Sequence, residues 1–279
     1  MRNNLVWFIT GASKGMGLTL TKKLLGKGFK VAATSRNIEL LKEGVGESED
    51  FLPIKLNLSD EEDVKQAIAQ TISKFGQLHV VVNNAGYGQI GYFEEISDAK
   101  TRQNFEVNVF GTFNVVRQVL PQLRKQRFGR IVNFSSTAGF YGFGGSSIYA
   151  ATKFAVDGFS ESLSQDVEPF GVRVIAVKPG YFRTSFLSEE SIGIRPDIPI
   201  DDYKQAREAQ IEAIQQYDRN QPGDPEKGMD VLIKAVQSEN PPLHLFLGKD
   251  AYEVAEQKIL NVQKDLNEWR IHGTTTDFD

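Results

Sequence analysis

The chain has 279 residues, of which 40% are hydrophobic and 24% are charged, and its formal net charge is −4. An apolar fraction of this size is enough to build a packed core, which argues against intrinsic disorder. The mild acidity argues against a general nucleic-acid binder, because such proteins need a basic surface to neutralise phosphates.

Side chains that usually hold metals are scarce. The chain has no Cys, which excludes disulfides, thiolate catalysis and Cys-based zinc sites. His79, His244 and His272 are far apart and lack any HExxH-type spacing, so we expect no metal site. No apolar run approaches the roughly 18 residues of a membrane span. The first run, Leu5 to Ile9, is too short for a signal peptide, so a cytoplasmic protein is expected.

Short apolar runs alternate with longer amphipathic stretches along the chain. Because most of these runs lack polar alternation, they indicate strands buried on both faces, as in a parallel sheet covered by helices. The predicted strands are, in chain order, Leu5–Thr10, Lys30–Ser35, Phe51–Leu56, Leu78–Asn83, Arg130–Ser135, Val172–Lys178 and Leu243–Leu247. This order predicts an α/β fold, a doubly wound (Rossmann) parallel sheet with helices on both faces, and a single domain over residues 1–279.

Two early helices have clear sequence signals. Met16, Leu20 and Leu24 recur at a spacing of four, which is typical of one helix face. A second helix is predicted to begin with Ser59 as its N-cap, followed by an acidic first turn, and to end near Gly76.

The organisation changes after Gly180. Residues 181–225 hold four prolines, several acidic pairs and no clear strand. Residues 201–217 have a helical pattern, but its apolar stripe is thin. We interpret 181–225 as a mobile insertion over one end of the sheet, a substrate loop or lid within the same domain.

Regular structure resumes with a helix from Asp224 or Pro225 through Val236, and a final helix starts near Asp250. Six residues of the final helix step by 3, 4, 3, 4 and 3 and form one apolar stripe: Tyr252, Ala255, Ile259, Val262, Leu266 and Trp269. We expect this stripe to pack on the core, and a subunit contact is the alternative.

A glycine-rich loop follows the first predicted strand. A strand, a glycine loop and a helix together point backbone N–H groups and the helix dipole at an anion, and glycines let the backbone approach a pyrophosphate closely. The spacing is GxxxGxG at the first βα turn, where dinucleotides bind. A loop without a ligand is the alternative. The predicted cofactor-binding residues here are Gly11, Ser13, Lys14, Gly15, Met16 and Gly17.

The end of the second strand predicts which dinucleotide binds. The strand ends Thr34-Ser35-Arg36, without the acidic residue that usually binds the ribose 2′-OH of NAD. Arg36 would pair bidentately with a 2′-phosphate, and Lys14 adds a second cation nearby. The sequence therefore favours NADP(H) over NAD(H). The alternative is that Arg36 is only solvated.

Three further residues suggest acid–base chemistry. Tyr149 and Lys153 lie four residues apart in a helical stretch and share a face, and Ser136 follows a strand. A Tyr can move the proton of an alcohol if its pKa falls from about 10 towards neutrality, and an ammonium about 4 Å away is worth at most about three pKa units. Ser136 would donate a hydrogen bond to the substrate oxygen. A surface Tyr beside a solvated Lys is the alternative.

Taken together, these motifs resemble the short-chain dehydrogenase/reductase family. The resemblance is close over about residues 3–185, and the spacing is similar to the compact branch. The motifs are TGxxxGxG at Thr10–Gly17, Asn83-Asn84-Ala85-Gly86, Asn108, Ser136, Tyr149-Ala150-Ala151-Thr152-Lys153 and Pro179-Gly180. The segment 241–248 with the insertion loosely resembles 17β-hydroxysteroid-dehydrogenase-like members. The resemblance implies an NADP(H)-dependent oxidoreductase acting on a carbonyl or alcohol. A nicotinamide-binding regulatory protein without turnover is the alternative.

The resemblance also implies individual roles. Tyr149 would be the acid/base, Ser136 would orient the substrate oxygen, and Lys153 would lower the Tyr149 pKa and bind the nicotinamide ribose. Asn108 would hold a water in a proton relay, with a backbone-bonding helix Asn as the alternative. Further cofactor contacts are implied for Asn57 and Leu58 beside the adenine, for Asn84, Ala85 and Gly86 along its centre, and for Pro179, Gly180 and Thr184 at the carboxamide. A homodimer or homotetramer through helices over 97–126 and 148–168 is also implied.

The loops expected around the site are rich in aromatic residues, and such loops converge beyond the strand ends where ligands bind. The rings are Tyr87, Tyr92, Phe140, Tyr141, Phe143, Tyr181, Phe182 and Phe186. We expect a small apolar or aromatic ketone, aldehyde or secondary alcohol. Its predicted contacts are Ser136, Phe143, Tyr149, Tyr181 and Phe186. The alternative is that the rings pack as core beneath the insertion, and Arg183 or Arg195 would favour a carboxylate.

Overall fold

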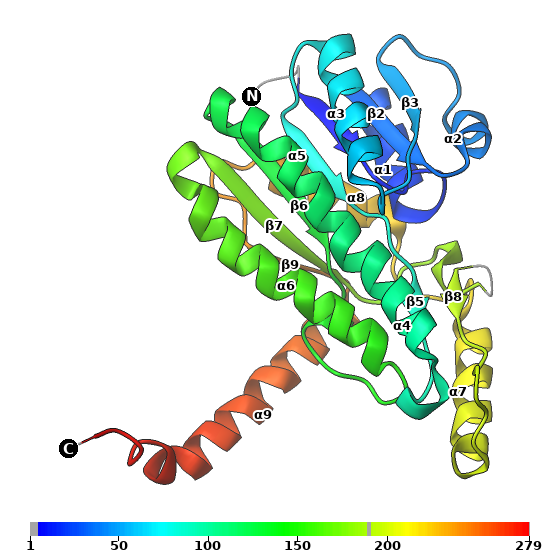
Figure 1. Cartoon of the computed structure of the whole chain (residues 1–279), viewed down its shortest axis with the longest axis vertical. Coiled ribbons are helices and arrows are strands. Elements are labelled where there is room, and N and C mark those ends of the chain that lie inside the picture. The colour runs from blue at the N-terminus through cyan, green and yellow to red at the C-terminus, as the bar shows by residue number, and fades with distance from the viewer. Residues whose placement is uncertain (1–4, 189–190, 279) are drawn as a thin grey trace.

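The computed structural model describes residues 5–188 and 191–278, and its centre is a parallel sheet between two layers of helices (Figure 1). The strand order is β3-β2-β1-β4-β6-β7-β9, and every neighbouring pair is parallel. The strands are β1 Val6–Ile9, β2 Lys30–Ser35, β3 Phe51–Lys55, β4 Val80–Asn83, β6 Gly129–Phe134, β7 Val172–Pro179 and β9 His244–Leu247. The predicted doubly wound sheet is confirmed, and the strand ends lie within two residues of the predicted ones.

Both faces of the sheet are covered, which explains the unbroken apolar runs. In β1, Trp7 and Ile9 belong to one core cluster, and Val6 and Phe8 belong to the other. The first cluster is closed by α1 (Gly15–Gly26), α2 (Ile38–Val45) and α8 (Pro225–Gln237), and the second by α3 (Glu61–Phe75), α5 (Gly111–Gln126) and α6 (Ser147–Val167). Since successive strand residues face opposite sides, both sides need apolar residues.

The start of α3 differs from the prediction by one residue. Asp60, not Ser59, is the N-cap, and its carboxylate accepts hydrogen bonds from the first-turn N–H groups. Ser59 is part of the preceding turn instead, because its N–H donates to Oδ1 of Asn57 at 3.2 Å. The helix ends as predicted at Gly76, which has a φ of 80°.

The long helix expected over 97–126 is interrupted. It consists of α4 (Asp98–Phe105), a π-helical turn over Glu106–Phe110, and α5. A π-helical turn holds one more residue than an α-helical turn, and such turns are frequent at functional sites. This turn carries Asn108, whose side chain is buried.

The segment between β7 and α8 is more ordered than expected. It contains β8 (Ile192–Gly193), which pairs in parallel with β5 (Gly88–Gln89), so the expectation of no strand is wrong. A two-residue ladder leaves no apolar run for a sequence pattern to detect. The expected helix is present as α7 (Lys204–Tyr217), and it has no buried residue.

The final helix, α9 (Lys249–Gly273), leaves the body and projects away from it (Figure 1). Only Ala251 and Ala255 are buried within it, so the expectation that its stripe packs on the core is wrong. The helix starts directly after the edge strand β9. The exposed fractions are 54% for Tyr252, 58% for Ile259, 41% for Val262, 55% for Leu266 and 68% for Trp269. Among the described residues, no helix is both long and apolar enough to cross a bilayer.

Candidate active site

The predicted site residues meet at the carboxyl ends of the central strands. The glycine loop follows β1, the Asn84–Gly86 segment follows β4, Ser136 follows β6 and Gly180 follows β7. The strand order reverses between β1 and β4, and ligands of such sheets bind in the crevice at this reversal.

The loops after β1 and β4 are fastened to each other. Oγ1 of Thr10 accepts hydrogen bonds from the N–H groups of Asn84 and Ala85, both at 3.1 Å. The Asn84 amide donates to the carbonyls of Thr10 at 3.0 Å and Gly11 at 2.9 Å. A Cβ on Gly11, which has a φ of +65°, would lie 2.7 Å from Cα of Ala85. Gly11 and Asn84 therefore build the loop itself.

The start of α1 suits a pyrophosphate. Lys14 is the N-cap residue, no side-chain cap bonds the first turn, and that turn holds no acidic residue. The backbone N–H groups at this end and the positive end of the helix dipole are therefore available to an anion. A Cβ on Gly15 would meet only Thr184, at 3.6 Å, so the backbone is open to a close approach. These residues fit a nicotinamide dinucleotide.

Lys14 itself points elsewhere than expected. Its ammonium donates to Oγ of Ser191 in the insertion at 2.6 Å. Beside it, the Ser35 hydroxyl donates to Oγ of Ser13 at 3.0 Å and accepts from the Asn37 N–H at 3.1 Å. The loop after β1 therefore contacts both the end of β2 and the insertion.

The residue that sequence reasoning missed is Lys55. A surface pocket is lined by Arg36, Lys55, Leu56, Asn57 and Asp63. Lys55 ends β3 and stands in register with Ser35 of β2. The end of the neighbouring strand, β3, examined together with the end of β2, would have identified this second cation.

The adenine-side residues Asn57 and Leu58 are used partly by the fold. The Asn57 N–H donates to Oδ2 of Asp63 at 2.7 Å, and its side chain accepts from the following turn. The Leu58 side chain lies against α5, where a Cβ on Gly111 would be 3.0 Å away. Asn57 borders the pocket beside Arg36, whereas Leu58 lies on the α5 side of the same loop.

The Ser–Tyr–Lys residues come together as their spacing predicts. Tyr149 and Lys153 lie one turn apart on α6, and the Ser136 hydroxyl is close enough to the Tyr149 hydroxyl to oppose the rise of its pKa. The Lys153 ammonium is 5.8 Å from the centre of the Tyr149 ring and donates to the Phe134 carbonyl at 2.8 Å. All three groups face the same side of the sheet end.

The electrostatics of this group differ from the expectation. Burial raises the pKa of Tyr149 to about 12, although the hydrogen bond from Ser136 opposes the shift and Tyr181 adds to it. Burial also lowers the pKa of Lys153 to about 8. Burial is the largest cause of both shifts, and the Lys153 ammonium is bonded to the Phe134 carbonyl, so a lowering of the Tyr149 pKa by Lys153 stays a prediction.

Asn108 joins the loop after β4 to α6. Its amide nitrogen donates to the Tyr87 carbonyl at 3.0 Å and to Oγ1 of Thr152 at 3.1 Å, and its oxygen accepts from the Tyr87 N–H at 3.1 Å. This matches the alternative of a backbone-bonding Asn, and the water relay stays a prediction. A Cβ on Gly86 would lie 3.0 Å from the Asn108 oxygen and 3.5 Å from the Lys153 nitrogen.

Three of the predicted substrate rings lie around Tyr149. Phe143 and Phe186 pack against its cluster, and the Phe186 ring is 6.0 Å from the Tyr149 ring. Tyr181 is 49% exposed and close enough to raise the Tyr149 pKa. Phe182 instead belongs to the core, as the alternative allowed.

The loop after β7 completes the site. The Gly180 N–H donates to the Leu247 carbonyl at 2.9 Å, and a Cβ there would collide with the carboxylate of Asp250. Oγ1 of Thr184 accepts from the Phe186 N–H at 3.2 Å. Pro179, Gly180 and Thr184 therefore lead from the sheet to the glycine loop, although no contact assigns them to a carboxamide.

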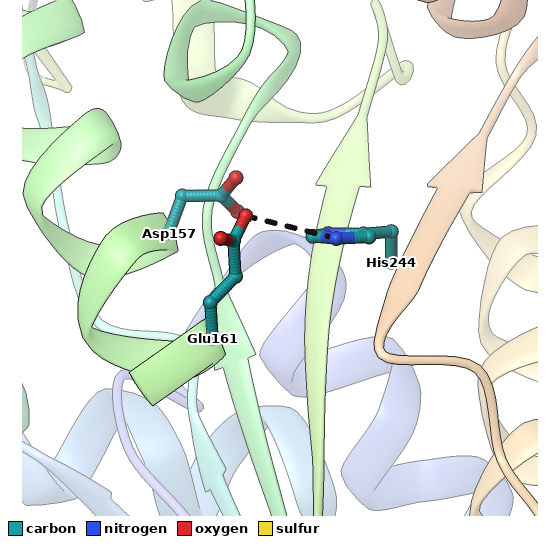
Figure 2. Close-up of side chains that lie close together, drawn as sticks. All are labelled: Asp157, Glu161 and His244. Carbon is teal, nitrogen blue, oxygen red and sulfur yellow. Dashed lines mark ion pairs between the residues drawn. The ribbon is translucent and has the colours of Figure 1, made fainter. Parts of the chain in front are cut away.

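A cluster of charged side chains joins α6 to β9, with Asp157 and Lys178 buried and Glu161 and His244 exposed. Figure 2 shows Asp157 and Glu161 of α6 facing His244 of β9, with His244 Nε2 at 3.6 Å from Glu161. The Lys178 ammonium is 2.7 Å from Oδ1 of Asp157 and 2.8 Å from Nδ1 of His244. Burial lowers the pKa of both Lys178 and His244. Because a cation already fills this position, we interpret the cluster as structural.

Comparison with known proteins agrees with this geometry. Residues 5–193 match the family model described as short chain dehydrogenase. An oxidoreductase, BOA17, from Botryotinia fuckeliana is 34% identical over 95% of this chain and 96% of its own. A 3-ketodihydrosphingosine reductase from Bacteroides thetaiotaomicron is 34% identical over 86% of both chains. The crystal structure of a short-chain dehydrogenase from Streptomyces avermitilis has a TM-score of 0.89 at 34% identity, covering 99% of this chain and 100% of that one.

Proposed function

The chain belongs to the short-chain dehydrogenase/reductase family, and on that premise we propose that it is an NADP(H)-dependent oxidoreductase that interconverts a ketone or aldehyde with an alcohol. Tyr149 is the acid/base and Ser136 binds the substrate oxygen. The observation that carries the proposal is the proximity of the Ser136 and Tyr149 side chains, beside the Lys153 ammonium and among the rings of Phe143 and Phe186.

When bound, the nicotinamide dinucleotide supplies or accepts the hydride. In the reductive direction the carbonyl carbon gains the hydride and the carbonyl oxygen takes the proton of the Tyr149 hydroxyl. The raised pKa keeps that proton on Tyr149 until negative charge develops on the substrate oxygen. Ser136 donates a second hydrogen bond to the same oxygen. Lys153 would hold the ribose hydroxyls of the cofactor, and Asn108 fixes the loop beside it.

We expect Tyr149→Phe to lower turnover by about 10²–10⁴-fold, because a general acid contributes on this scale. The variant should still bind NADPH, measured by quenching of Trp fluorescence, since only one hydroxyl is removed. Tyr252→Phe is the matched control, because it removes the same phenolic hydroxyl from α9 and keeps the ring. Unchanged turnover in Tyr149→Phe would remove this residue from the mechanism.

The alternative function is a nicotinamide-binding regulatory protein without turnover. It is less favoured because the chain retains both Tyr149 and Lys153, which such a protein does not need. The same assay separates the two functions. NADPH binding by the unmodified chain without oxidation or reduction across a broad panel of carbonyls and alcohols would support the regulatory protein.

The substrate proposed is an apolar or aromatic ketone, aldehyde or secondary alcohol. The apolar surroundings of Tyr149 support it, and so does the Bacteroides relative, whose name describes a ketone reductase. Arg183 uses its Nε to donate to the Gln221 carbonyl at 3.1 Å, and its terminal nitrogens keep the carboxylate alternative open. A panel of matched ketones with and without a carboxylate tests this point, and a preference for the acids would contradict it.

The cofactor proposed is NADP(H), and two cations support it. Arg36 and Lys55 border one pocket at the ends of β2 and β3. A 2′-phosphate there would form charge-assisted hydrogen bonds, worth about 1.5–3 kcal/mol each, or about 10- to 100-fold in affinity.

We therefore expect Arg36→Gln and Lys55→Gln each to weaken NADPH binding by about 10-fold or more, by the same estimate, and to leave NADH binding nearly unchanged. Ser35→Asp combined with Arg36→Gln should shift the preference towards NAD(H). Ratios of kcat/KM for the two cofactors measure both effects. Lys42→Gln on α2 is the control, since Lys42 pairs with Glu39 and does not border the pocket. A higher efficiency with NADH in the unmodified protein would contradict the assignment.

A further inference from the structure

The exposed stripe of α9 has the period of a coiled-coil seam. Its six positions, Tyr252, Ala255, Ile259, Val262, Leu266 and Trp269, alternate steps of three and four residues, so they form the a and d positions of successive heptads, and all but Ala255 are exposed. α9 projects from the body with large apolar side chains in water. Helix propensity alone stabilises a helix little, and most helical stability comes from packing of the apolar face. We therefore expect another apolar surface of the same length to cover the stripe.

We propose that the α9 stripe binds the α9 stripe of a second copy of this chain as an antiparallel two-stranded coiled coil. The order of side chains supports this arrangement, because it begins and ends with an aromatic residue and has Ile259 and Val262 at its centre. Reversal places Tyr252 opposite Trp269 of the other copy and Ile259 opposite Val262, and it brings Leu266 beside Ala255, which is buried. Each contact occurs twice, as a two-fold axis requires.

The flanking charges are self-complementary in the same register. Lys258 and Asp265 each precede an a position, and residues in this position face their counterparts across an antiparallel pair. The register that aligns Ile259 with Val262 brings Lys258 opposite Asp265 of the other copy, and the two-fold axis repeats the pair. Neither residue has an ion-pair partner within the described chain, so both are available for this contact.

The charge balance of α9 favours a protein partner over a lipid surface. Helices that lie on a membrane carry a polar face rich in Lys and Arg. The described α9 has four basic residues against five acidic ones, which leaves no basic excess. The basic residues are Lys249, Lys258, Lys264 and Arg270, and the acidic ones are Asp250, Glu253, Glu256, Asp265 and Glu268.

The end of the proposed pair reaches a row of aromatic rings. The Tyr252 ring is 5.9 Å from that of Phe246, and the Phe246 ring is 5.4 Å from that of Phe140. Phe140 lies in the loop that begins at Ser136. The Trp269 of the second copy would extend this row at Tyr252, so pairing of the two helices also supports the loop beside the catalytic serine.

Disulfide trapping tests the contact and its direction, and the chain is suited to it because it has no Cys. Ile259→Cys and Val262→Cys are prepared separately, mixed under mild oxidation and examined for a cross-linked dimer. The antiparallel register predicts that the mixture cross-links at least 10-fold faster than either variant alone. Leu260→Cys, on an exposed residue outside the stripe, is the control. Faster linking of Ile259→Cys to itself would indicate a parallel pair, and rates no higher than the Leu260→Cys control would overturn the proposal.

Sedimentation velocity gives a second test that does not depend on oxidation. Ile259→Glu combined with Leu266→Glu should remove one dimerisation step from the oligomer at concentrations where the unmodified chain is associated. Leu260→Glu should leave it unchanged, and helical circular dichroism should remain similar in both because all three side chains are exposed. Association through other helices, such as α5 and α6, would persist in both variants. Identical assembly of the two variants would contradict the inference.

A charge exchange tests the register. Lys258→Asp places two acidic residues opposite each other in each pair, and Asp265→Lys places two basic ones, so each variant alone should associate more weakly than the unmodified chain. An equal mixture should form heterodimers well beyond the statistical half, measured by native mass spectrometry with one chain tagged. A statistical mixture would show that Lys258 and Asp265 do not meet.

Discussion

Tyr149 and Lys153 are both buried, and burial acts on them in opposite directions. Each loses hydration of its charged form, so the pKa of the phenol rises to about 12 and that of the ammonium falls to about 8. Their spacing in the sequence predicts that they share a helix face. It does not predict how deeply α6 lies beneath the loops, and this depth decides the direction of both shifts.

The Lys153 shift makes stability depend on pH. Between about pH 8 and 10.5 the folded chain binds fewer protons at Lys153 than the unfolded chain does, so the free energy of unfolding should rise with pH in this window. The expected rise is about 1–3 kcal/mol. Urea unfolding at two pH values within the window, kept below the range where Tyr149 ionises, measures it.

Lys153→Met is the comparison for this measurement, because it removes the titrating group and keeps a side chain of similar length. Burial lowers the pKa of Lys178 as well, so that residue contributes to the rise in both proteins. The difference between the two slopes therefore reports Lys153 alone. Equal slopes would show that Lys153 is already neutral or well solvated in the folded protein.

At the scale of elements, the insertion is held to the body by polar contacts and by stacked rings. Oε1 of Glu95, a buried residue, accepts from the Ile200 N–H at 2.9 Å and from Arg207. The rings of Tyr92 and Tyr203 stack with centres 4.5 Å apart. Because α7 buries no residue, these contacts decide its position, and we propose that residues 181–225 form a lid over the site.

Removal of the Glu95 carboxylate should release this lid. We expect Glu95→Ala to speed hydrogen exchange in α7 and at Ile200 by 10-fold or more. The sheet should change little, because a local opening breaks only the contacts of the segment that opens. The KM for the carbonyl substrate should rise while NADPH affinity stays similar. Glu208→Ala, on an exposed residue of α7, is the control. Unchanged hydrogen exchange in Glu95→Ala would show that other contacts keep α7 in place.

Elements with a long apolar pattern were predictable, and short or polar ones were not. All seven strands of the main sheet follow from their Val- and Ile-rich runs. The helix α2 was missed because it buries only Leu41, and β8 was missed because a two-residue ladder has no periodicity. The pairing of β8 with β5 joins segments about one hundred residues apart, and this depends on the tertiary fold.

At the scale of the whole molecule, the sequence predicted the sheet, its two helical layers and the edge where the site lies. These follow from strand burial and from the right-handed connection between parallel strands. The same reasoning misplaced the α9 stripe. An apolar period shows that a face is buried by something, but it does not show whether the body or another chain covers it. The exposure of Ile259 and Leu266 in the structure shows that the body does not cover them.

The π-helical turn at Glu106–Phe110 has a consequence for how this enzyme can change over time. Each residue advances a helix by about 100°, so deletion of one residue there would rotate Asn108 away from Tyr87 and Thr152 while leaving α5 intact. We expect loss of one residue within this turn to disrupt the site more than a substitution at an exposed position of α4. Descendants of this chain should therefore keep the number of residues between Gly86 and Gly111 even where the residue types between them change.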